Sequence, residues 1–265
     1  MKFGIIIPTY NRPEYLRLAL SSLLSQKYQD WVAVVANDGS TQDYSATERD
    51  FNDPRIIFVN RLMNGGCNAA RNTAIDRAVI EGCDFISFLD DEETLPIHSL
   101  ETAEKTINAH SAYGWYICNT YGETKPSSRK IIKHARLNWL DHYLYGKELR
   151  GDKMHFIRCS VLREIRFDPR YRASNMWPFY IRLGSRTAIY AFPDALKELR
   201  YLPTGITKTN QRRARSLREI YSRFGEHLLA IRYRPTKVKA WKYLLLELLK
   251  TPKRLFNLGL YKLTH

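Results

Sequence analysis

Four acidic residues in a row, DDEE (90–93), follow the apolar run 84–89. Adjacent carboxylates repel one another, so they stay ionised at low cost only beside a cation. A hard divalent cation takes oxygen ligands and keeps room for water and for the phosphates of a substrate. The cluster therefore predicts a metal site whose cation neutralises charge on a departing diphosphate. The alternative is a solvated acidic turn that caps the following helix.

Two further polar clusters follow apolar runs that indicate buried strands. TYN (9–11) comes after the run 3–7, and NDGS (37–40) comes after the run 31–36. In an open parallel sheet, ligands bind beyond the carboxyl ends of the strands. We therefore expect these two clusters and the acidic cluster to meet in one crevice. Within it, Asp38 is a candidate acceptor of hydrogen bonds from a base or a ribose, unless it only closes an Asx-type turn.

A glycine pair, Gly65-Gly66, opens the next predicted helix, and Arg71 follows about one helical turn later. Arg71 is a candidate to face an anionic phosphate or a base edge, with an ordinary surface arginine as the alternative. The glycines match neither GxGxxG nor GxxxxGK[ST]. This argues against the dinucleotide-binding oxidoreductases and the P-loop enzymes.

The clusters lie within a regular alternation of strand-like and helix-like segments. This alternation predicts an α/β fold with a mainly parallel sheet and helices on both faces. Besides the three apolar runs, the expected elements are helices at 13–25 and 65–78, strands at 55–59, 115–119 and 155–158, a loop at 122–129 and a helix that begins at Trp177.

Four segments in this order, IIIPTYNRPEYL, NDGSTQD, NGGCNAARNTAI and FLDDEETLP, lie within residues 3–96. Together they resemble the family 2 glycosyltransferases of GT-A fold, and a weaker match continues through 156–169 and 177–184. The resemblance implies an enzyme of bacterial cell-envelope polysaccharide synthesis. Such an enzyme moves a sugar from a nucleotide diphosphate-sugar, with UDP-sugars favoured, to a hydroxyl of a glycan or of a lipid-linked acceptor.

The resemblance also implies roles for residues of the three clusters. The nucleotide-sugar would be bound by Pro8, Thr9, Tyr10, Asn11, Asp38, Arg71 and Asp90. Asp91 and Glu92 would stand at the metal, Mn²⁺ or Mg²⁺, and the spacing leaves open which of them is the principal ligand. A nucleotidyltransferase is an alternative interpretation of this sequence. However, PTYNRP does not supply the Gly/Arg/Lys-rich triphosphate loop expected of that class.

One part of the family pattern is missing. In inverting members an acidic pair precedes the W-x-F-x-x-R-L helix, and its aspartate deprotonates the acceptor hydroxyl. Here no Asp or Glu occurs between Arg170 and Pro193. The candidates for a displaced base are Asp152, His155 and Asp168, although His155 is also a candidate structural histidine or metal ligand. A retaining mechanism and a catalytically inactive homologue that acts as a binding or scaffold subunit stay open.

Positive charge is concentrated near the C-terminal end of the sequence. The net charge of the 265 residues is +15, and residues 205–265 hold 15 Lys/Arg and 3 Glu, a net of +12. Residues 239–255 have the spacing of an amphipathic helix. Its apolar stripe is Trp241, Leu244, Leu245, Leu248 and Leu249, its flanking charges are Lys239, Lys242, Lys250, Lys253 and Arg254, and Arg212, Arg213, Arg215 and Arg218 lie upstream. This predicts an interfacial helix on anionic lipid, or a helix packed on the catalytic domain.

These patterns together predict a domain organisation and a location. We expect a GT-A domain at 1–205, with a nucleotide-sugar-binding half at 1–100 and an acceptor half at 101–205, and a basic helical tail at 206–265. Four scattered cysteines indicate a reducing compartment, and no apolar run reaches the roughly 18 residues of a bilayer span. We expect a cytoplasmic protein, peripheral on the inner face of the cytoplasmic membrane. No nucleic-acid recognition motif accompanies the charge.

Overall fold

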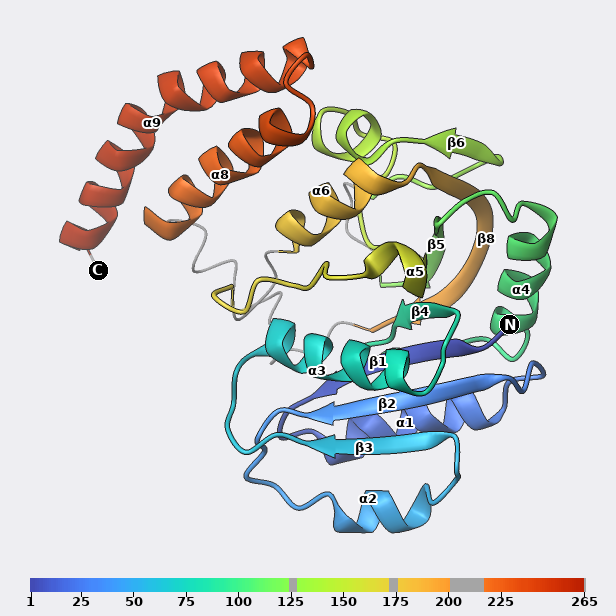
Figure 1. Cartoon of the computed structure of the whole chain (residues 1–265). Coiled ribbons are helices and arrows are strands. Elements are labelled where there is room, and N and C mark those ends of the chain that lie inside the picture. The colour runs from blue at the N-terminus through green and yellow to red at the C-terminus, as the bar shows by residue number, and fades with distance from the viewer. Residues whose placement is uncertain (124–127, 172–175, 201–216, 265) are drawn as a thin grey trace.

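The computed structural model describes residues 1–123, 128–171, 176–200 and 217–264, and within them eight strands form one sheet with helices on both faces (Figure 1). The strands are β1 (Phe3–Thr9), β2 (Trp31–Asn37), β3 (Ile56–Asn60), β4 (Phe85–Phe88), β5 (Trp115–Gly122), β6 (Ala135–Leu137), β7 (Met154–Arg158) and β8 (Ile189–Leu199). The helices are α1 (Pro13–Leu24), α2 (Ser45–Asp50), α3 (Cys67–Ile80), α4 (Ser99–Ala109), η1 (Leu140–Leu144), α5 (Cys159–Leu162), α6 (Trp177–Arg186), α8 (Leu217–Tyr233) and α9 (Val238–Thr264). The α/β layering that the sequence predicts is confirmed.

β1 lies inside the first half of the sheet, which has the order β3-β2-β1-β4 with all strands parallel. Both faces of β1 are buried because helices cover them. Ile5 and Ile7 share a core with α1, whereas Ile6 shares the opposite core with α3. Gly4 lets α3 approach closely, since a Cβ there would lie 2.9 Å from the Cβ of Ala78. The carboxyl ends of β1, β2 and β4 therefore reach the same edge of the sheet.

The second half of the sheet, β4-β7-β5-β8-β6, mixes strand directions. β7 is antiparallel to both β4 and β5, whereas β8 is parallel to β5. β8 curves strongly (Figure 1), and its register with β5 shifts at Cys118 and Asn119. Such an irregularity bends a strand. Because β8 bends, its last residues lie next to the first half of the sheet, where Glu198 pairs with Thr94 just beyond the acidic cluster.

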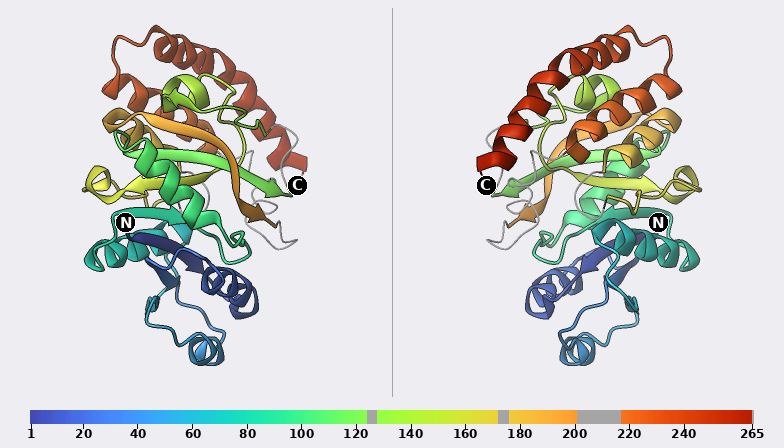
Figure 2. Two further views of the ribbon diagram at one scale, coloured as in Figure 1. Left: turned by 90° about the vertical axis from the view of Figure 1, so that its right-hand side faces the viewer. Right: turned by 90° about the vertical axis from the view of Figure 1, so that its left-hand side faces the viewer.

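The C-terminal helices α8 and α9 lie at the end of the molecule opposite to β3 and α2, as Figure 2 shows from two sides. α8 packs against α6, and α9 packs against α8. The predicted amphipathic helix 239–255 lies within α9. Leu244 packs against the core, whereas Trp241, Leu245, Leu248 and Leu249 are between 53% and 69% exposed. The predicted apolar stripe is therefore divided between the protein and the solvent.

Some predictions concern residues outside the described ranges. Ser174 and Asn175, which stand near the place of the missing acidic pair, lie there, and so do Arg212, Arg213 and Arg215. The side chain of Arg218 is also outside the description. The boundary expected near residue 205 falls in such a segment. The division of the chain into a donor half, an acceptor half and a tail stays a prediction.

Candidate active site

The ends of β1 and β4 meet at the carboxyl edge of the sheet. The Thr9 hydroxyl donates a hydrogen bond to Oδ2 of Asp91 (2.8 Å) and lies 2.8 Å from the hydroxyl of Tyr44. Asp91 is fully buried. The first polar cluster and the acidic cluster are thus in direct contact, and in this structure the side chains of Thr9 and Asp91 make contacts within the protein.

Arg12, which the sequence patterns did not single out, faces the acidic cluster 90–93, which forms a turn after β4 and is called the acidic turn below. Its guanidinium nitrogens lie 2.9 Å from Oδ1 of Asp91 and 3.2 Å from Oε2 of Glu92. Burial raises the pKa of both carboxyl groups above their usual values, and the charge of Asp90 raises them further. Ionisation of this pair therefore depends on a facing cation, and Arg12 provides one.

Asp90 and Glu93 connect the acidic turn to two other elements. Nη2 of Arg71, on α3, lies 2.7 Å from Oδ1 of Asp90; the arginine side chain is 8% exposed and the aspartate side chain 40% exposed. Oε2 of Glu93 accepts a hydrogen bond from the backbone nitrogen of Asp90 (2.8 Å) and pairs with Nζ of Lys197 (2.7 Å). Lys197, on β8, therefore positions the turn from the other half of the sheet.

Asp38, which follows β2, uses both carboxylate oxygens to hold the segment that leads into α3. Oδ1 accepts hydrogen bonds from Nε of Arg61 (2.8 Å) and from the backbone nitrogen of Gly65 (3.0 Å). Oδ2 accepts one from the backbone nitrogen of Gly66 (2.7 Å). A carboxylate offers about four acceptor positions, so these three bonds leave room for a bond to a ligand. The contacts give Asp38 a structural role that its turn alone did not indicate.

The remaining candidate residues near the end of β1 are Pro8, Asn11 and Tyr10. Pro8 is a buried residue of β1. Oδ1 of Asn11 accepts hydrogen bonds from the backbone nitrogens of Thr41 (2.8 Å) and Gln42 (3.2 Å), which ties the segment after β1 to the segment after β2. Tyr10 is 42% exposed. Its ring is therefore accessible to a ligand at this edge.

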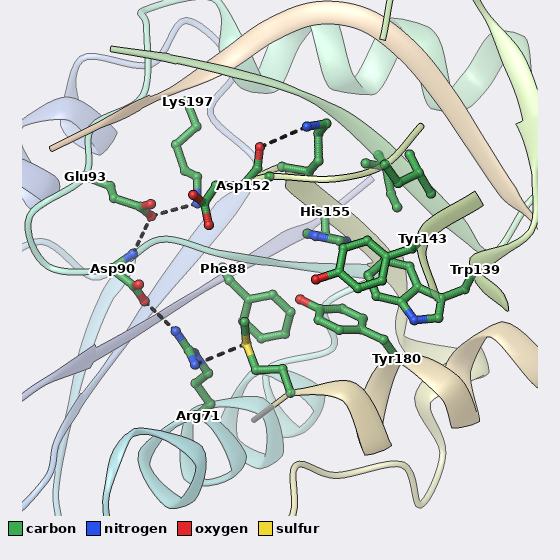
Figure 3. Close-up of a pocket in the computed structure, with 15 residues that line it drawn as sticks. Arg71, Phe88, Asp90, Glu93, Trp139, Tyr143, Asp152, His155, Tyr180 and Lys197 are labelled. Atoms are coloured by element: carbon green, nitrogen blue, oxygen red, sulfur yellow. Dashed lines mark hydrogen bonds and ion pairs between the residues drawn. The ribbon is translucent and has the colours of Figure 1, made fainter. Parts of the chain in front are cut away.

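A cavity of about 140 Å³ lies between the acidic turn and the second half of the sheet (Figure 3). One wall is aromatic: the ring of Trp139 has its centroid 4.1 Å from that of Tyr143 and 4.7 Å from that of Tyr180. The charged lining residues are Arg71, Asp90, Glu93, Asp152, Lys153 and Lys197. A cavity with an apolar wall and a few converging polar groups suits a small ligand that has both an apolar ring face and ionic substituents.

His155 lines this cavity, but its surroundings disfavour a role as a base. Its Nδ1 accepts a hydrogen bond from Nε1 of Trp115 (3.1 Å), which assigns the proton of the neutral ring to Nε2. Burial, together with the ammonium groups of Lys197 and Lys153, lowers the pKa of His155 to about 3. An imidazole whose acceptor nitrogen is already bonded is a poor proton acceptor.

The two candidate aspartates lie in different places. Asp168 lies outside the cavity that contains Asp90, and Arg170 lies 2.6 Å from its carboxylate and lowers its pKa. Asp152 lines the cavity (Figure 3), and its backbone oxygen accepts hydrogen bonds from Oγ1 of Thr120 (3.0 Å) and Nζ of Lys153 (3.3 Å). These bonds fix the backbone that presents its carboxylate. Of the two aspartates, Asp152 is the one at the cavity.

Comparison with protein families matches residues 4–168 to the model of glycosyl transferase family 2. The chain belongs to this family. The resemblance drawn from the four sequence segments is thereby confirmed. The matched range includes the three clusters, Arg71 and two of the aspartates considered above, Asp152 and Asp168.

Curated relatives of this family 2 member include two bacterial glucosyltransferases. The GalNAc(5)-diNAcBac-PP-undecaprenol beta-1,3-glucosyltransferase of Campylobacter jejuni is 31% identical over 177 residues, which are 64% of this chain and 56% of that protein. The UDP-Glc:alpha-D-GlcNAc-diphosphoundecaprenol beta-1,3-glucosyltransferase WfgD of Escherichia coli is 33% identical over 190 residues, with coverage of 60% and 74%. The chain spans between 16% and 65% of the length of the first three curated relatives that it matches.

Solved structures share the fold. Staphylococcus aureus TarS 1-349 in complex with UDP-GlcNAc has a TM-score of 0.77 at 18% identity, over 94% of this chain and 72% of that one. The mannosyltransferase PcManGT from Pyrobaculum calidifontis, in complex with GDP-Man and Mn²⁺, has a TM-score of 0.61 at 18% identity, over 92% and 69%. The predicted GT-A fold is confirmed. Within the described residues, no helix combines the length and the apolar character that a membrane crossing requires.

Proposed function

We propose that this family 2 member transfers a sugar from a nucleotide diphosphate-sugar, with UDP-sugars favoured, to a hydroxyl of a glycan or lipid-linked acceptor in cell-envelope polysaccharide synthesis. The position of the Arg71–Asp90 pair carries the proposal. The pair lies beside the clusters at the ends of β1 and β2, and it also lines the cavity. In this arrangement, the nucleotide of a bound donor lies beside Tyr10 and Asp38, and its sugar lies in the cavity. The names of the two glucosyltransferase relatives support a lipid-linked acceptor.

Thermal melting in the presence of nucleotide-sugars tests the donor, because a ligand that binds the folded state raises its melting temperature. We expect UDP-sugars to give the largest increase. Hydrolysis of the bound donor with Mn²⁺ or Mg²⁺ then separates an enzyme from the second candidate, an inactive homologue that serves as a scaffold. Donor binding without hydrolysis or transfer would favour the scaffold, and no response to any nucleotide would contradict both candidates.

We propose that the cavity supplies the proton acceptor and the positive charge that the transfer step needs. A bond forms between the acceptor oxygen and the anomeric carbon, the bond from that carbon to the diphosphate breaks, and the acceptor hydroxyl loses its proton. We assign the proton to the carboxylate of Asp152, because the structure disfavours His155 and places Asp168 elsewhere. Arg71 and Lys197 lie where they oppose the negative charge of the departing diphosphate.

The acidic turn has donor atoms that suit Mg²⁺ or Mn²⁺. Oδ1 of Asp91 and Oε2 of Glu92 are buried and lack a hydrogen bond in the described part of the chain, although Arg12 faces both. Among the described residues no three ligand side chains surround a common point. One or two carboxylates completed by water and substrate phosphates are usual for Mg²⁺. We propose that Asp91 and Glu92 hold the ion, which when bound supplies charge neutralisation for the diphosphate.

Replacing Glu92 with glutamine is expected to weaken Mn²⁺-dependent UDP binding by at least about tenfold, since even outer-shell changes at metal sites cost about 10–100-fold. Glu92 is the better target because Asp91 also accepts the hydrogen bond from Thr9, so its loss would disturb the sheet edge. Calorimetric titration of UDP at several Mn²⁺ concentrations measures the effect. The control is Glu101→Gln, on the exposed surface of α4. Equal Mn²⁺ dependence in both variants would rule out Glu92 as a ligand.

We further propose that α9 docks the protein on the inner face of the cytoplasmic membrane. Trp241, Leu245, Leu248 and Leu249 present apolar surface to the solvent, and Phe256 continues it at 68% exposure. Exposed cations among the described side chains of this helix are Lys239, Lys242, Lys250 and Lys253. Each basic residue near an anionic surface contributes about 1 kcal/mol, and the apolar side chains add burial. The two kinds of side chain together suit a surface of anionic lipid.

Replacing Trp241, Leu245 and Leu249 with serine is expected to remove the part of vesicle binding that persists at high salt. The charges act over a Debye length that falls to about 3 Å at 1 M, so only the apolar contribution survives there. Co-sedimentation with phosphatidylglycerol and with phosphatidylcholine vesicles measures both parts. A matched control replaces three exposed apolar residues elsewhere, Leu62, Ile80 and Ile132. Equal binding by the two triple variants would mean that α9 is not the docking surface.

A further inference from the structure

A second cavity, of about 340 Å³, lies between α6, α8 and residues 168–171. α6 separates it from the cavity described above. Met176, at the N-cap of α6, and Tyr180 line the first cavity, whereas Trp177, Pro178 and Arg182 of α6 line the second. A helix with its side chains is about 10–12 Å across. A chain of a few sugar units, rather than a single sugar, is therefore needed to reach from one cavity to the other.

The second cavity carries an excess of positive charge. Arg170, Arg182 and Arg232 line it, and Asp168 is the acidic residue among its lining residues. Asp168 is engaged by Arg170, which donates from Nε to Oδ1 (3.0 Å) and from Nη2 to Oδ2 (2.6 Å). Arg182 and Arg232 have no hydrogen bond or ion pair through their side chains with any part of the chain that the structure describes. Two guanidinium groups are thus available to an anionic ligand.

The walls of this cavity are held in place by buried contacts. Nδ2 of Asn68, on α3, donates to the backbone oxygens of Asp168 (3.2 Å) and Tyr171 (2.7 Å), and Asn68 is fully buried. On the other side, Nε1 of Trp177 donates to Oγ of Ser222, on α8 (2.8 Å). The arginines therefore project from supported elements. Such preorganisation lowers the entropy cost of binding a ligand.

We propose that this second cavity binds the phosphate or diphosphate group of the acceptor, through the guanidinium groups of Arg182 and Arg232. Guanidinium groups bind the oxygens of phosphate, as they bind those of carboxylate, in pairs of parallel hydrogen bonds, so their geometry suits a phosphate group. The assignment rests on the proposed function, because it takes the acceptor hydroxyl to be in the first cavity beside Asp152. An acceptor whose sugar chain ends in a diphosphate fits both cavities at once, with its anionic end next to α8, which α9 covers.

Calorimetric titration of inorganic pyrophosphate into the full chain in EDTA, with and without UDP, tests the proposal. The double variant Arg182→Gln/Arg232→Gln is expected to bind pyrophosphate at least about tenfold more weakly than the wild type, since it loses charge-assisted hydrogen bonds. The control Arg49→Gln/Lys105→Gln removes two exposed positive charges elsewhere and is expected to bind like the wild type. Unchanged melting temperatures verify that both variants fold.

Three results would overturn the proposal. The first is equal pyrophosphate binding by the wild type and the Arg182/Arg232 variant. The second is complete displacement of pyrophosphate by UDP, which would place the anion in the donor site. The third is a loss of binding to phosphatidylglycerol vesicles alone, with pyrophosphate affinity unchanged, which would mean that the arginines contact lipid headgroups. A chain that binds pyrophosphate through these arginines but never binds a nucleotide-sugar would contradict the proposed function and leave the anion site in place.

Discussion

Replacing Asp152 with asparagine is expected to lower kcat by about 10²–10⁴-fold, the usual cost of removing a general base. The carboxylate lines the cavity, and asparagine keeps its size while losing its ability to take a proton. The hydrogen bonds from Thr120 and Lys153 go to the backbone oxygen of Asp152 and not to its side chain, so the backbone of this segment is expected to keep its conformation. Donor affinity, measured by calorimetry, should change little, and steady-state transfer to the acceptor measures kcat.

Asp76→Asn, on α3, is the matched control for this experiment. It makes the same change of a carboxylate to an amide at an aspartate outside both cavities, where the side chain is 60% exposed and pairs with Arg166. We expect it to keep turnover within a few-fold of the wild type. Similar turnover for both variants would remove Asp152 as the base. The anomeric configuration of the product, read by NMR, would then show whether the protein follows a retaining route.

Replacing Asp38 with alanine is expected to destabilise the protein by about 3 kcal/mol, because one substitution leaves several donors without their acceptor. The lost bonds are those to Arg61, Gly65 and Gly66. For a domain of this size class, each kcal/mol lowers the melting temperature by about 2–4 °C, so we expect a decrease near 10 °C. UDP affinity should fall in parallel, since these bonds set the course of the chain into α3 and hence the position of Arg71. Thermal melting and UDP titration measure both effects.

The control is Asp43→Ala, in the same stretch of chain. Asp43 is an exposed carboxylate that accepts a hydrogen bond from the backbone nitrogen of Ser45 (2.9 Å), as a helix cap does. Loss of such a cap costs about 1 kcal/mol. If Asp38→Ala melts at the same temperature as Asp43→Ala, the carboxylate of Asp38 does not organise this segment and acts on the ligand alone.

The first half of the molecule was predictable because its signals are local. Each of the apolar runs 3–7, 31–36 and 84–89 is closely followed by its polar cluster, so finding the strand also finds the candidate site residues. The parallel arrangement then brings the clusters to one edge without any further information. The same reasoning identified Arg71, since the helix that carries it starts at a recognisable glycine pair.

The second half depends on contacts between residues far apart in the sequence, which no spacing reveals. β8 has the sequence IYAFPDALKEL, in which a proline and three charged residues break the apolar run, and its place beside β5 comes from packing. Lys197 meets Glu93, 104 positions away. Arg12 was within a recognised segment, but its role appears only when α1 begins beside the acidic turn. Periodicity found the stripe on α9 but not that Leu244 faces inward.

The place of β4 between β1 and β7 also sets the order in which the sheet is completed on the ribosome. The partner of β4 on one side, β1, precedes it in the chain, but its other edge has no partner until Met154–Arg158 emerges. All four residues of β4, FISF, are buried in the finished fold. A bare apolar edge is a template for pairing with another chain. Nascent chains that stall before β7 are therefore the species most exposed to aggregation, and chaperones that bind apolar strands would act in this interval.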